Sequence, residues 1–109
     1  MNTRKFSYKQ EERVAKIIEG KVVANSGATS FNKGDVRLEN LLLVECKTST
    51  TPKNSFSIKK EWLTKIKQES FEQGISNCCV SIDFGSEDDY FIIDKNLMKK
   101  LIEKLKEEN

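Results

Sequence analysis

Two acidic residues and a lysine stand close together in the first half of the chain, in a pattern suited to metal chemistry. Asp35 precedes the apolar run LLLV at 41–44, and Glu45 and Lys47 follow that run. Alternation along a strand places Glu45 and Lys47 on one face. Two neighbouring carboxylates repel each other unless a cation lies between them. Mg²⁺ takes one or two such carboxylates, so the pattern predicts a magnesium site in which Mn²⁺ is expected to substitute.

The same residues also allow a plain salt bridge between Lys47 and one carboxylate at the end of a sheet. The pattern of Asp, nine residues and Glu-x-Lys is short and occurs often by chance. Spacing alone therefore leaves the metal site and the salt bridge both open.

The turn between the two segments decides whether the carboxylates meet. A two-residue turn would pair Leu38 with Leu41 and turn Asp35 away from Glu45. A three-residue loop would pair Leu38 with Leu42 and place Asp35 across from Glu45. We predict the three-residue loop.

Hydrophobic periodicity predicts the elements that position these residues. We expect helices over 7–19, 58–72 and from 94 onward, and strands over 21–25, 34–38, 41–48, 78–84 and 90–93. Ser7 and Gln10 form a capping box for the first helix, and Asp94 caps the last. The run at 41–44 is apolar on both faces, so its strand should lie centrally. The order α-β-β-β-α-β-β-α predicts an α/β fold with a mixed five-stranded sheet flanked by helices.

Two further surfaces can be predicted from the pattern. The last helix carries an apolar stripe that we expect to pack on the core, although it could instead serve as a docking face. The stripe consists of Leu97, Met98, Leu101, Ile102 and Leu105. The acidic run at 87–89 is expected to be a solvated turn.

Composition narrows the chemistry further. The chain has 109 residues and a formal charge of +2, which fits one domain over residues 1–109 with a flexible basic arm at 1–7. It has no histidine, which excludes Ser-His-Asp and Cys-His catalysis and histidine-based zinc sites. Its three cysteines, Cys46, Cys78 and Cys79, contain no CxxC spacing and suit small apolar residues in a reducing compartment. No signal peptide or membrane span is apparent, so a cytoplasmic protein without a membrane partner is expected.

Several motifs together resemble a known superfamily. Gly34-Asp35 followed by Glu45-Cys46-Lys47 resembles the signature of the PD-(D/E)XK nucleases, although Gly34 stands where that signature has proline. The acidic pair Glu11-Glu12 and the loop Asn25-Ser26-Gly27 are similar to archaeal-type Holliday junction resolvases and their phage relatives. The resemblance covers about residues 8–94 and implies a restriction-endonuclease-like core.

The resemblance also implies roles for individual residues. Asp35 and Glu45 would bind the metal, and Lys47 would attend the attacking water. Glu12 would complete the acidic cluster, with Glu11 as the alternative. Ser26 would match the serine that resolvases carry in a loop near the scissile phosphate, and Ser30 is the weaker alternative. Gln68 would match a glutamine on a helix of some related nucleases.

The function implied is a magnesium-dependent DNA endonuclease that leaves a 5′-phosphate. Its expected substrate is a four-way junction cut symmetrically by a homodimer, in the cytoplasm of a host cell if the protein is phage-encoded. The alternatives are a nuclease of the same fold acting on other branched or duplex DNA, and a non-catalytic DNA-binding module. Phosphate contacts are expected from basic residues that could also be ordinary solvated charges: Arg4, Lys5, Lys53, Lys59 and Lys60.

Overall fold

The computed structural model describes residues 3–24 and 34–108. Its elements are α1 (Thr3–Ile18), β1 (Lys21–Val22), β2 (Val36–Leu38), β3 (Leu42–Thr48), α2 (Lys60–Glu72), β4 (Asn77–Asp83), β5 (Asp89–Ile92) and α3 (Lys95–Glu107). The strands form one five-stranded sheet in the order β1-β2-β3-β4-β5. Only β3 and β4 are parallel among these strand pairs, so the sheet is mixed. The predicted α/β class, element order and central position of β3 are confirmed.

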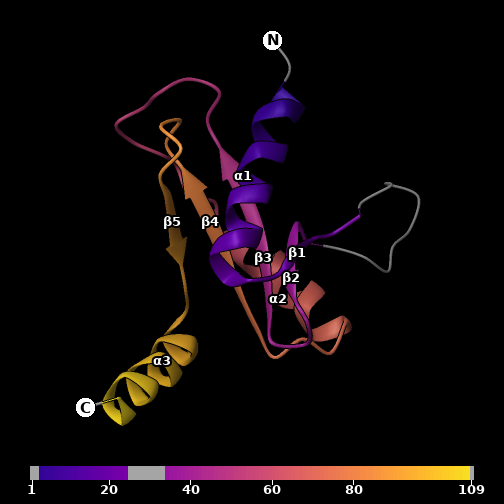
Figure 1. The fold of residues 1–109 in the computed structure, drawn as a ribbon, viewed down its shortest axis with the longest axis vertical. Coiled ribbons are helices and arrows are strands. Elements are labelled where there is room, and N and C mark those ends of the chain that lie inside the picture. The colour runs from indigo at the N-terminus through magenta and orange to yellow at the C-terminus, as the bar shows by residue number, and fades with distance from the viewer. Residues whose placement is uncertain (1–2, 25–33, 109) are drawn as a thin grey trace.

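Helices cover both faces of this sheet (Figure 1). On one face, Val14 of α1 packs against Val36 and Val44. On the other face, Ile66 of α2 packs against Leu43 and further strand residues. Because neighbours on β3 point to opposite faces, Glu45 and Lys47 lie on the α2 side, whereas Cys46 lies on the α1 side.

The β2–β3 hairpin has the register that brings the two carboxylates together. Leu38 pairs with Leu42, and Val36 pairs with Val44. The backbone N–H of Leu41 donates to the Leu38 carbonyl at 2.9 Å, which closes the turn. The predicted three-residue loop is confirmed.

The start of α1 differs from the prediction. The helix begins at Thr3, so the capping box expected at Ser7 and Gln10 is wrong, and residues 3–7, expected in a flexible arm, are helical. The reason lies in Gln10, whose side chain is fully buried. Its Nε2 donates to the carbonyls of Lys47 and Ser81 at 3.0 and 3.3 Å, so it joins α1 to the sheet instead of capping the helix.

The last helix also differs from the prediction. Its cap is as expected, because the Asp94 side chain accepts a hydrogen bond from the Leu97 N–H. Within the described residues of α3, however, none is buried. Figure 1 shows α3 continuing from β5 away from the sheet. The expectation that its apolar stripe packs on the core of the same chain is therefore wrong.

No helix in the described parts of the chain, residues 3–24 and 34–108, has the length and apolar character needed to cross a membrane.

Candidate active site

Asp35, Glu45 and Lys47 come together at the edge of β3. The pairing of β2 with β3 ends at Val36 and Val44. Beyond this pair, the Asp35 carboxylate takes the place of a β2 backbone carbonyl as a hydrogen-bond partner of β3. Its Oδ2 accepts a hydrogen bond from the Cys46 N–H at 2.7 Å. One residue along on β3, the Glu45 carboxylate lies 3.3 Å from the Lys47 ammonium.

Gly34 fixes the backbone that presents Asp35. Its φ is 87°, in the left-handed region that favours glycine. A Cβ at this position would lie 2.6 Å from Cδ1 of the buried Leu43. Proline, with φ near −65°, cannot adopt this conformation. The local geometry therefore accounts for glycine, and not proline, at position 34.

The Asp35 and Glu45 carboxylates have too little positive charge nearby to balance their repulsion. Burial, and next the neighbouring Glu45 carboxylate, raise the pKa of Asp35 to about 6. The Cys46 N–H and the more distant charges of Lys47 and Lys65 act in the opposite direction without offsetting this rise. A cation between the two carboxylates would relieve the repulsion.

Lys47 is held between an acid and an aromatic ring. Its Nζ lies 4.8 Å from the centroid of the Trp62 ring on α2, within cation–π range. Trp62 in turn meets Phe56 edge to face, with ring centroids 6.2 Å apart. The ammonium group therefore has a defined position beside Glu45 while its side chain remains 30% exposed.

The two glutamates of α1 have different surroundings. Glu12 is exposed, whereas Glu11 is half-buried. Burial raises the pKa of the Cys46 thiol, and the Asp35 and Glu11 charges raise it further. Glu11 is therefore an α1 acid whose charge acts on Cys46, on the α1 side of β3.

The acidic groups are of the chemical type that binds a hard cation, but only some of them lie close enough together to bind one. Asp35 and Glu45 offer carboxylate oxygens at one strand edge, which suits Mg²⁺. Glu11 approaches from the α1 side, but Glu45 lies on the α2 side. Accordingly, no group of three potential metal ligands is close enough together among residues 3–24 and 34–108. A two-carboxylate site completed by water is the arrangement that these residues support.

The other predicted site residues are less informative. Ser26 and Ser30 lie outside the described residues, as does the side chain of Arg4. Gln68 is exposed on α2. Four lysines of the expected DNA contacts are also exposed: Lys5, Lys53, Lys59 and Lys60. In Figure 1 the start of α1 and the loop after β3 lie at the same end of the molecule.

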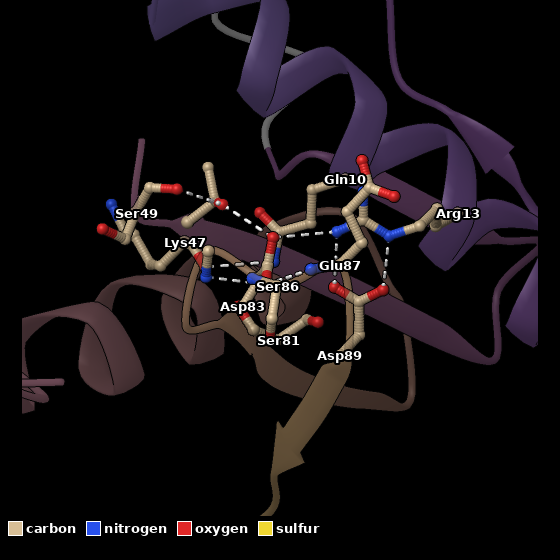
Figure 2. A network of polar contacts seen from close by, with 11 residues as sticks. Gln10, Arg13, Lys47, Ser49, Ser81, Asp83, Ser86, Glu87 and Asp89 are labelled. Atoms are coloured by element: carbon tan, nitrogen blue, oxygen red, sulfur yellow. Dashed lines mark hydrogen bonds and ion pairs between the residues drawn. The ribbon is translucent and has the colours of Figure 1, made fainter. Parts of the chain in front are cut away.

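A second charged network lies between α1, β4 and β5 (Figure 2). The guanidinium of Arg13 contacts Asp89 at 2.9 Å and Asp83 at 3.0 Å. Asp83 also accepts hydrogen bonds from Thr48 and from the backbone N–H groups of the turn at 85–87. The side chain of Asp89 is 2% exposed, so the prediction of a solvated turn at 87–89 is wrong for this residue.

Burial raises the pKa of Asp83, but the bonds from Thr48 and Gly85 and the Arg13 charge outweigh burial and hold it below its usual range. Sequence inspection missed this network, although an aspartate at the end of the apolar strand predicted over 78–84 was an available signal.

A scan of family models found no match to this chain, and searches of curated proteins and of solved structures found none either.

Proposed function

We propose that this chain is a magnesium-dependent DNA endonuclease whose active site contains Asp35, Glu45 and Lys47. The observation that carries the proposal is the β2–β3 register, which places two carboxylates at one strand edge beside a fixed ammonium group. Asp35 and Glu45 would hold the ion, with Glu11 as the acid from α1. Bound Mg²⁺ supplies positive charge that stabilises the negative charge developing on the phosphate.

Lys47 has the chemistry to handle the attacking water. Its ammonium group can donate a hydrogen bond that orients the water, and it can take the proton of the water only after it has lost one of its own. Glu45 and Trp62 restrict where the ammonium group can lie, so the group that orients the water is positioned before substrate binds. The water oxygen would attack phosphorus, the P–O3′ bond would break, and the 3′-oxygen would leave with a proton, so the phosphate would stay on the 5′-oxygen as a 5′-phosphate.

The proposed substrate is a four-way DNA junction cut by a homodimer. The resemblance of the Asp and Glu-x-Lys motif to the resolvases supports this choice of substrate. Two-fold symmetry also suits paired cuts in two like strands. Exposed Lys53 and Lys59, in the loop that follows β3, and Lys60, at the start of α2, offer charges for phosphate contacts.

A specific observation favours a second function, a DNA-binding module without catalysis. Glu45 already pairs with Lys47 at 3.3 Å, which is the salt bridge of the simpler interpretation. If that pair is permanent, the same lysine-rich surface could bind DNA without cleaving it.

Cleavage of a synthetic four-way junction and a matched linear duplex, in Mg²⁺ and in chelator, separates these functions. Asp35→Asn and Glu45→Gln should abolish cleavage but retain junction binding in a mobility-shift assay. Glu103→Gln, an exposed acid on α3, is the matched control and should cleave as the wild type does. Near wild-type turnover by Asp35→Asn or Glu45→Gln would contradict the metal site. A wild type that binds the junction but cleaves no DNA in Mg²⁺ or Mn²⁺ would indicate the binding module.

A further inference from the structure

An uncovered apolar face on α3 points to a binding partner. Met98, Leu101 and Ile102 are 48%, 45% and 42% exposed, and they lie together on one side of the helix. Asp94 caps the first turn of α3. One contact joins α3 to the sheet in its outward direction, because the Lys100 ammonium donates to Oδ1 of Asn77 at 2.7 Å.

The same chain carries a trough on its α2 side whose first part is largely apolar. One hollow of about 230 Å³ lies between α2 and the strands, lined by Leu63, Ile66, Cys78 and Ile92. A second hollow of about 240 Å³ continues toward Phe71, which is 80% exposed. The two hollows share Lys67, Cys78 and Asp94, so they form one continuous trough beside α2. Asn96, Leu97 and Lys100, from the first turns of α3, line the second hollow, whereas none of the described α3 residues beyond Lys100 lines either hollow.

We infer that two copies of this chain exchange α3 helices, each laying its apolar face in the trough of the other. The area involved favours exchange over a simpler contact between the two α3 helices. A helix of 13 residues is about 20 Å long, and half of its surface is on the order of 400 Å². Pairing of two such faces buries about 800 Å², below the roughly 1,000 Å² expected of a specific interface. Reciprocal exchange into two troughs buries about 1,600 Å², the standard size of a stable interface.

The exchange also explains features that a monomer leaves unexplained. The helix is well capped and amphipathic, yet beyond the half-buried Leu97 its apolar side is exposed, at Met98, Leu101, Ile102 and Leu105. The link from β5 to α3 is only Ile93 and Asp94, so the outward direction of α3 follows directly from the edge strand. Two-fold exchange covers the apolar face of α3 and the trough beside α2 in both copies. The inference rests on this surface alone and does not depend on nuclease chemistry.

Sedimentation tests the self-association directly. The wild type should sediment with the mass of two chains, and Leu101→Glu should sediment as one chain because a carboxylate in the interface weakens association at least about tenfold. Lys99→Glu, on α3 but outside the apolar face, is the matched control and should remain a dimer. Circular dichroism checks that each variant keeps its fold. A wild type of one-chain mass, or a dimer that persists in Leu101→Glu, would overturn the inference.

Cross-linking tests the exchange itself. Under oxidation, Met98→Cys or Leu101→Cys should form a covalent two-chain product through native Cys78 in the trough of the other copy. Lys99→Cys should form none, and adding Cys78→Ser to either α3 variant should abolish the product. A disulfide within one chain would show that α3 folds back onto its own trough, and a two-chain product that survives Cys78→Ser would show direct α3 pairing. Either result would overturn the exchange.

Discussion

Two clusters in this protein have the same charges, two carboxylates and one cation, but differ in how those charges are satisfied. In the first cluster Arg13 contacts Asp83 and Asp89 together. In the second, Lys47 contacts Glu45, while Asp35 has the Cys46 N–H as its bond within the described residues. Asp83 accepts three backbone N–H groups and the Thr48 hydroxyl besides its ion pair.

The pKa directions follow this difference. Burial raises the pKa of both aspartates, but hydrogen bonds and Arg13 reverse the effect at Asp83, whereas Glu45 reinforces it at Asp35. Buried carboxylates that are fully bonded stabilise the fold, because breaking their contacts leaves uncompensated charge. Carboxylates that repel each other instead leave room for a further cation. The two clusters therefore differ in how many hydrogen bonds and ion pairs their carboxylates make, and not in their charges. We call the Arg13 cluster the saturated cluster and the Lys47 cluster, which forms the candidate site, the unsaturated cluster.

The largest expected effect comes from removing the cation of the saturated cluster. Arg13→Ala leaves two buried carboxylates without their partner and should lower the free energy of unfolding by about 3 kcal/mol. Lys16→Ala, an exposed position on the same helix, should leave it nearly unchanged. Asp35→Asn should give stability equal to or above the wild type in chelator, because it removes a repelling charge. Urea unfolding measures all three, and a strongly destabilised Asp35→Asn would contradict the comparison.

The second prediction concerns the backbone that presents Asp35. Gly34→Ala adds both an unfavourable positive φ and a clash with Leu43, so it should cost about 2 kcal/mol of folding free energy. Gly74 provides a matched control, because its φ is 68° but a Cβ there meets nothing within 4 Å. Gly74→Ala should therefore cost only about 1 kcal/mol. Equal costs in thermal or urea unfolding would show that the contact with Leu43 does not constrain the site.

Local patterns predicted much of the fold and the core of the candidate site. The apolar run on both faces placed β3 centrally, because alternation along a strand shows in consecutive residues. The three-residue loop was predicted for another reason, since the proposed site requires Asp35 opposite Glu45 and the local sequence left a two-residue turn open; the pairing of Leu38 with Leu42 confirms it. The prediction that Asp94 caps the last helix is likewise confirmed.

What sequence reasoning missed depends on contacts between distant residues. Arg13 is 70 and 76 positions from Asp83 and Asp89, so no local pattern joins them. Gln10 looked like a capping residue because its two carbonyl partners are 37 and 71 positions away. Periodicity showed that α3 has an apolar face, but it could not show whether the same chain covers that face.

The third prediction uses acid to weaken the saturated cluster. The pKa of Asp83 is lowered in the folded state, so its contribution to stability is complete above about pH 4, its unfolded range, and is lost as the pH falls through the folded value. The stability difference between the wild type and Asp83→Asn should therefore be largest near neutral pH and shrink in acid. Asp88→Asn, at an exposed position in the same turn, is the matched control for the loss of one negative charge. A difference for Asp83→Asn that stays constant down to about pH 2 would contradict the assignment.

The smallest expected effect tests how the unsaturated cluster positions its cation. Trp62→Leu removes the ring that lies 4.8 Å from the Lys47 ammonium. A partly buried cation–π contact contributes about 1 kcal/mol, so under the proposed function kcat should fall about fivefold while KM changes little. Trp62→Phe retains a ring and should recover part of this loss. Phe56→Leu removes the neighbouring ring, 6.2 Å from Trp62, and controls for lost packing. Because Phe56→Leu leaves the contact between Trp62 and Lys47 in place, an equal fall in kcat for Phe56→Leu and Trp62→Leu would show that Trp62 acts through packing and not by positioning Lys47.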